Sequence, residues 1–146
     1  MLKSMNEGDK NLLLKDLCIR LPYGVKCRWV FDGFSNEGEL TDICHQEGVN
    51  GFKYWDGYLS YDGEDIPIEI IKPYLRPMSS MTEEERYDYR HMLGATLNSE
   101  GESILFVYVE DFSTVLDWLN EHHFDYRGLI EKGLALEAPE GMYKTE

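Results

Sequence analysis

Three Asp-Gly pairs between residues 25 and 76 constrain the fold of this chain more than any other feature of its sequence. They are Asp32-Gly33, Asp56-Gly57 and Asp62-Gly63. Asp-Gly favours two-residue hairpin turns, because both central residues of a type I′ turn need a positive φ. The pair at 56–57 lies between two aromatic segments, Phe52 to Trp55 and Tyr58 to Tyr61, and gives the strongest hairpin prediction in the chain. This region therefore predicts short antiparallel strands joined by tight turns.

The first of these strands is predicted from an alternation of residue types. Val25, Cys27, Trp29 and Phe31 fall on one face of an extended segment, whereas Lys26 and Arg28 fall on the other. Such alternation is typical of a half-buried strand, in which Cys27 is a small core residue. The four further predicted strands are Glu39 to Ile43, Phe52 to Trp55, Tyr58 to Tyr61 and Ile66 to Ile71. This five-strand antiparallel meander fits either closure into a small SH3-like barrel or an open sheet with a helix packed on one face.

Helices are predicted on both sides of the meander. Apolar residues at helical spacing predict an N-terminal helix from Leu12 to Leu21, which Pro22 and Gly24 end. Thr82 and Glu85 form a capping-box pattern for a helix from Glu83 to Leu93, with Gly94 after its end. The remaining predictions are a buried strand from Ser103 to Glu110, a helix from Ser113 to Glu121 with Val115, Leu116 and Leu119 on its apolar face, a closing helical turn from Leu129 to Leu136, and a frayed tail from Ala138.

The predicted fold class is therefore α+β: an N-terminal helix, the five-strand meander, and then helix, strand and helix. One domain spans residues 1–146, with a β-rich part at 25–76 and an α/β part at 79–137. Hydrophobic residues make up 42% of the chain, and it contains ten Tyr, six Phe and three Trp. This aromatic content favours a folded core, because disordered acidic segments are poor in such residues.

Negative charge accumulates along the chain. The formal net charge of −14 is distributed as 0 over residues 1–40, −4 over residues 41–80 and −10 over residues 81–146. Nucleic acid and anionic membrane surfaces both require Lys and Arg, so direct binding to either is disfavoured. The expected partner is a protein with a basic surface.

The cysteines and the apolar segments bear on the compartment. Three cysteines, Cys18, Cys27 and Cys44, have no CxxC spacing and no even pairing, which is unlike a small oxidised domain. Residues 1–10 lack the apolar core of a signal peptide, and the longest strongly apolar run, Ile104 to Val109, is too short to cross a bilayer. A cytoplasmic protein with reduced thiols is expected.

Two His-containing clusters carry side chains of the types used in metal binding or catalysis. His122, His123 and Asp125 are zinc-ligand types, but neighbouring helical residues point about 100° apart, so a polar helix terminus is the preferred interpretation. Cys44-His45 would suit a cysteine hydrolase only with a suitable context, which the surrounding sequence does not supply. Glycine-rich phosphate loops do not occur. No catalytic, cofactor-binding or metal-binding residue is assigned, and no cofactor is expected.

Two sets of residues are candidates for protein binding. Hairpin aromatics form the first set: Tyr54, Trp55, Tyr58 and Tyr61. They suit either an exposed peptide-binding surface or cross-strand packing in the core. Acidic residues form the second set: Glu83, Glu84, Asp88, Asp117 and Glu121, with Glu110 and Asp111 as further members. A non-enzymatic protein-binding module that acts through either set is the first functional hypothesis.

Two other hypotheses belong to different classes. If the acidic residues share one surface, the chain is an acidic nucleic-acid mimic that inhibits a host nuclease or regulator, and its binding weakens steeply with salt. An unrecognised hydrolase that uses His45 or His122 is the third hypothesis.

Four segments together resemble a group of small uncharacterised proteins from genomes, phages and mobile elements of Bacteroides-type bacteria. The segments are Lys15 to Cys18, Leu21 to Lys26, Lys72 to Glu84 and His123 to Ile130. The group has no established activity, so no residue role is transferred. The resemblance implies a bacterial or mobile-element setting and is associated with host-interaction or anti-defence roles.

Overall fold

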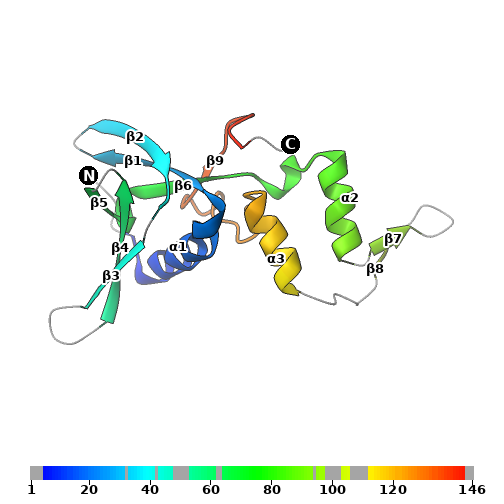
Figure 1. Ribbon diagram of the computed structural model, residues 1–146, viewed down its shortest axis with the longest axis horizontal. Helices are drawn as coiled ribbons and strands as arrows, with labels where there is room; N and C mark the ends of the chain where they lie inside the picture. The colour runs from blue at the N-terminus through cyan, green and yellow to red at the C-terminus, as the bar shows by residue number, and fades with distance from the viewer. Residues whose placement is uncertain are drawn as a thin grey trace.

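The computed structural model describes residues 5–31, 33–41, 43–47, 53–61, 64–93, 95–97, 103–105 and 112–143 (Figure 1). In residues 44–67 the description is of the backbone alone. The helices are α1 (Glu7–Arg20), α2 (Glu83–Met92) and α3 (Phe112–Glu121), with short 3₁₀ turns η1 (Leu21–Tyr23), η2 (Ile68–Ile70) and η3 (Met78–Ser80). The strands are β1 (Lys26–Phe31), β2 (Phe34–Glu39), β3 (Ile43–Glu47), β4 (Lys53–Tyr61), β5 (Glu64–Pro67), β6 (Ile71–Leu75), β7 (Ala95–Leu97), β8 (Ser103–Leu105) and β9 (Leu136–Glu137). The predicted α+β class is confirmed.

A four-stranded mixed sheet with the order β2-β1-β6-β9 forms the centre of the fold. β1 is antiparallel to β2 and to β6, whereas β9 is parallel to β6. Helix α1 packs on one face of the sheet, where its leucines meet the predicted apolar face of β1. That core includes Leu13, Leu14, Leu17, Val25, Cys27, Trp29, Ile71 and Leu75. The predicted alternation in β1 and the core position of Cys27 are therefore confirmed.

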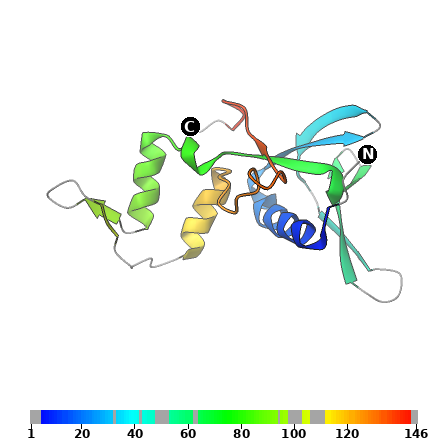
Figure 2. The ribbon, with the colours of Figure 1, turned by 180° about the vertical axis from the view of Figure 1, so that it is seen from behind.

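The SH3-like barrel prediction is wrong, because the sheet stays open. Strands β3, β4 and β5 form a separate three-stranded sheet in place of a continuation of the first. The alternative that the sequence also allowed, an open sheet with a helix on one face, describes the structure. Figure 2 shows from behind that α1 lies along the sheet, with α3 beyond it and α2 farther out.

The five predicted strands differ from the observed ones in how the chain is divided. Asp56-Gly57 lies inside β4, so residues 53–55 and 58–61 belong to one nine-residue strand, while Phe52 lies outside the described residues. β3 pairs with β4 on both sides of this dipeptide, at residues 53–54 and 58–59, and the register shifts between them, so Asp56-Gly57 forms an irregularity within the strand in place of a hairpin turn. Residues 39–43 join β2 to β3, and residues 66–71 divide among β5, η2 and β6.

The other two Asp-Gly pairs lie between paired strands. Phe31 pairs with Phe34, and Gly33 between them has a φ of +78°, as a tight hairpin turn requires. Tyr61 pairs with Glu64, and Asp62-Gly63 between them lies outside the described residues. The turn predicted after the first strand is confirmed by this pairing and by Gly33, while Asp32 lies outside the described residues.

Helix α1 is longer than predicted. Its N-cap is Asn6, whose Oδ1 accepts a hydrogen bond of 2.7 Å from the Asp9 N–H. The polar first turn hides this start from a search for apolar spacing. At the other end, η1 and Gly24, with a φ of +70°, terminate the helix as Pro22 and Gly24 predicted.

Helices α2 and α3 pack against each other around a second apolar cluster. Its buried members are Met81, Val115, Leu119 and Phe124. The capping box at Thr82 and Glu85 is confirmed. Leu116 is exposed, against its predicted place on the apolar face. Of the predicted strand at residues 103–110, β8 covers Ser103–Leu105, and the rest lies outside the described residues, as does Gly94.

The C-terminal segment is ordered by its contacts with the sheet. Residues 129–133 form turns in which the Lys132 N–H donates to the Gly128 carbonyl at 3.3 Å, as in one turn of a helix, and β9 then pairs with β6. The Ala138 N–H donates to the Leu75 carbonyl at 2.8 Å, so the frayed tail predicted from Ala138 is wrong. Among the described residues, no helix has the length and apolar character to span a membrane.

Candidate binding surface

The hairpin aromatics are placed by the backbone of β4. Tyr54 pairs with Gln46, Tyr58 pairs with both Cys44 and Pro67, and Tyr61 pairs with Glu64. Trp55 lies in the same strand, next to Tyr54. β4 is thus the central strand of the three-stranded sheet, with a neighbour on each side.

The acidic candidates are distributed over two helices. Glu83, Glu84 and Asp88 are exposed on α2, and Asp117 and Glu121 are exposed on α3. Asp117 accepts a hydrogen bond of 3.2 Å from the Tyr23 hydroxyl of η1, whereas the neighbouring Trp118 stacks on Tyr89 of α2. Asp117 therefore lies toward the α1 side of α3. Glu110 and Asp111 lie outside the described residues.

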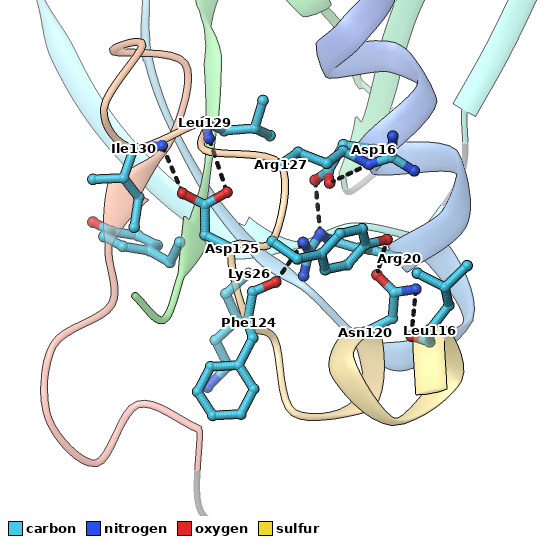
Figure 3. A network of polar contacts seen from close by, with 12 residues as sticks. Asp16, Arg20, Lys26, Leu116, Asn120, Phe124, Asp125, Arg127, Leu129 and Ile130 are labelled. Carbon is cyan, nitrogen blue, oxygen red and sulfur yellow. Dashed lines mark hydrogen bonds and ion pairs between the residues drawn. The ribbon is translucent and has the colours of Figure 1, made fainter. Parts of the chain in front are cut away.

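A buried ionic network joins α1 to the segment after α3 (Figure 3). Asp16 and Arg20 are both 0% exposed, and Arg20 Nε lies 2.7 Å from Asp16 Oδ2. Arg20 also donates to the Phe124 carbonyl at 2.6 Å, and Arg127 Nε lies 3.3 Å from the other oxygen of Asp16. Burial raises the pKa of the Asp16 carboxyl, while the Arg20 guanidinium opposes that rise. This network is a structural clamp.

Asp125 organises the turn beside this clamp. Its two carboxylate oxygens accept hydrogen bonds from the Leu129 and Ile130 N–H groups at 2.8 and 2.9 Å. Both bonds satisfy backbone donors that would otherwise be buried without a partner. Asp125 is a zinc-ligand type by sequence, and its carboxylate is engaged in this turn.

Arg76 and Glu85 form a second clamp between β6 and α2. Two guanidinium nitrogens lie 2.8 and 2.6 Å from the two Glu85 oxygens, and the Arg76 guanidinium carbon is 4.2 Å from the centre of the Phe124 ring. The hydrogen bonds from Arg76 lower the pKa of Glu85 to about 2. The sequence pattern predicts only the capping role of Glu85, because its partner nine residues away has no local signature.

His123 lies directly after α3 and is buried, whereas the sequence predicts a polar helix terminus there. His123 has a φ of +63°, and its ring stacks on Tyr143 with 3.6 Å between the ring centres. Burial lowers the pKa of His123 to about 4. The Tyr143 hydroxyl donates to the Tyr74 carbonyl at 2.7 Å and accepts from the Lys26 N–H at 2.8 Å. His123 and Tyr143 thus hold the C-terminal segment against the sheet.

In the described part of the chain, no group of three or more His, Cys, Asp or Glu side chains has an arrangement that would hold a metal ion. Cys18 is exposed, and the Cys44 and His45 side chains are outside the description.

The free edge of β2 is the most accessible part of the sheet. Across residues 34–39 every residue is exposed except Gly38, and among the described residues β2 has β1 as its single neighbour. Phe34 is 73% exposed and Val30 in β1 is 46% exposed. The Leu40 N–H donates to the Val25 carbonyl, so by alternation the backbone groups of residues 35, 37 and 39 point away from β1.

This edge also has a definite charge. Glu37 and Glu39 project from the face of the sheet opposite α1, where they pair in register with Arg28 and Lys26 of β1. The Tyr74 hydroxyl also donates a hydrogen bond of 2.5 Å to the Glu37 carboxylate. The sequence-based predictions do not include this edge, because the unbroken polar run from Ser35 to Glu39 lacks the alternation that marks a half-buried strand. Comparison with protein-family models, curated proteins and solved structures finds no match to this chain.

Proposed function

We propose that this chain is a non-enzymatic protein-binding module whose free β2 edge receives an extended, basic segment of a partner protein. The observation that carries the proposal is the exposed six-residue edge strand with backbone groups directed outward at residues 35, 37 and 39. Strand addition supplies main-chain hydrogen bonds to such an edge, and side chains at alternate positions supply specificity.

Charge favours a basic segment over a second copy of β2. Two copies of β2 would bring Glu37 and Glu39 near the same carboxylates of the partner copy, and like charges across strands destabilise pairing. Lys or Arg at alternate positions would instead face them, and the net charge of −14 would speed the encounter. The resemblance to proteins of bacterial mobile elements supports a bacterial setting, and the cytoplasmic location stays a prediction.

A pair of short peptides tests this proposal. A short peptide of alternating Lys and Val should slow hydrogen exchange at the amides of Ser35, Glu37 and Glu39, whereas a Glu-Val peptide of the same length should have little effect. Glu39→Lys replaces one attraction between β2 and a Lys of the bound peptide by a repulsion. This change costs about 1 kcal/mol of binding free energy and should weaken Lys-Val binding about fivefold. NMR titration measures both effects.

Glu131→Lys is the matched control, because it makes the same charge change at an exposed turn residue far along the chain. It should leave the affinity for the Lys-Val peptide within about twofold, since a distant exposed charge is screened by salt. Equal binding of the two peptides, or protection confined to residues outside β2, would contradict the proposed edge.

A further inference from the structure

A hollow on the sheet face opposite α1 lies apart from the β2 edge. It has a volume of about 340 Å³ and is lined by Arg28, Trp29, Val30, Glu69, Ile70, Lys72 and Leu136. These residues come from β1, η2, β6 and β9, so the hollow is set on the central strands of the four-stranded sheet. Its volume is near the lower end of the range for small-molecule pockets, which suits a compact ligand better than a nucleotide.

Two cations meet at this hollow. Arg28 of β1 and Lys72 of β6 are direct register partners, so both side chains project from the same face of neighbouring strands. Like charges in this position repel each other, and on its other side Arg28 has Glu37 of β2 as its register partner. Glu37 offsets the charge of Arg28, so Lys72 is the cation of this pair that has no acidic register partner among the described residues.

The two cations differ in what holds them. Arg28 Nε donates to Ser35 Oγ at 2.8 Å, which fixes the guanidinium along the sheet. Lys72 is exposed, and within the described ranges no hydrogen bond or ion pair engages its ammonium. Glu69 at the rim is held by Lys10, whose Nζ is 3.0 Å from the carboxylate. The Lys72 ammonium is thus available to an incoming anion.

Apolar side chains form the rest of the wall. Val30 is 46% exposed, and Ile70 and Leu136 are partly buried. Burying such surface favours a ligand with an apolar body beside its charged group. A bare inorganic anion would leave this surface in water.

We propose that this hollow is a binding site for a small organic carboxylate, with the carboxylate at Lys72 and Arg28 and a compact apolar body against Val30, Ile70 and Leu136. This site goes beyond the proposed β2 edge and uses a different ligand class. It leaves Glu37 and Glu39 free for a protein segment.

Titration with 4-methylpentanoate, followed by NMR, tests the site. The carboxylate should shift the backbone signals of residues 28, 30, 70 and 72, and its neutral analogue 4-methylpentanamide should bind at least about fivefold more weakly, because it has no charge for Lys72. Acetate, which has the charge without the apolar body, should also bind more weakly.

Lys72→Gln is the direct variant, and Lys132→Gln at an exposed turn residue is its matched control. Lys72→Gln should weaken 4-methylpentanoate about fivefold and leave the unfolding midpoint unchanged or higher, because the repulsion from Arg28 is removed. Lys132→Gln should bind like the natural chain. Equal binding of acid and amide, an unchanged affinity of Lys72→Gln, or shifts confined to residues outside the hollow would overturn the site, whatever the result of the Lys-Val peptide experiment.

Discussion

Asp16→Ala is expected to lower the free energy of unfolding by about 3–5 kcal/mol, because it removes one partner of a buried ion pair. Asp16 and Arg20 are both fully buried, and Arg127 approaches the same carboxylate. Without Asp16, the Arg20 guanidinium keeps one hydrogen bond, to the Phe124 carbonyl, and loses its counter-charge. Urea unfolding followed by circular dichroism measures the change.

The double variant Asp16→Leu with Arg20→Met separates lost charge from lost packing. Replacing both members of a buried pair by apolar residues often costs far less than removing one, so the double variant should be more stable than Asp16→Ala. Glu131→Ala, at an exposed position, should stay within about 0.5 kcal/mol of the natural chain. If Asp16→Ala also stayed within that range, the clamp in Figure 3 would contribute no net stability.

Acidification from about pH 6.5 to pH 4 is expected to lower the free energy of unfolding by about 3 kcal/mol through His123 alone. The folded chain keeps this ring neutral down to a pKa of about 4, mainly through burial and secondly through the Arg20 charge. In the unfolded chain the ring binds its proton near its ordinary pKa of about 6.5, so the unfolded state gains protons first and stability falls across this interval. Urea unfolding at closely spaced pH values measures the slope.

His123→Asn provides the test of this assignment. Asn tolerates the positive φ at this position and does not titrate, so the slope between about pH 6.5 and pH 4 should flatten. The Glu85 contribution lies lower: its folded pKa of about 2 means that its stabilisation is lost between about pH 4.5 and pH 2. Glu85→Gln should therefore leave the higher interval unchanged, and a slope in His123→Asn equal to that of the natural chain would rule out His123 as the cause.

The parts of the fold that were predicted correctly from the sequence depend on neighbours in the chain. The alternation from Val25 to Trp29 and the capping box at Thr82 and Glu85 each depend on a few consecutive residues, and the structure contains both. The hairpin prediction at Asp56-Gly57 is wrong because β3 pairs with β4 on both sides of this dipeptide, and a local pattern does not show such pairing with a separate segment.

The candidate surfaces were harder to predict because they arise from pairing between distant segments. Arg28 and Lys72 are far apart in the sequence and meet because β1 and β6 are neighbours. The spacing of Asp16 and Arg20 is visible as an i, i+4 ion pair, but their burial depends on residues 124–127. The sequence therefore shows where these charged residues are in the chain, but not which residues surround them in the fold.

The tie between Lys26 and Tyr143 spans 117 positions and has a consequence for biosynthesis. On the ribosome, β1 and β6 are translated well before Tyr143, which binds both strands, and before β9, which pairs with β6. Until β9 is translated, β6 has no strand on that flank, and an unpaired strand edge is a site of misassociation. A chaperone that holds the nascent chain would matter most during that interval.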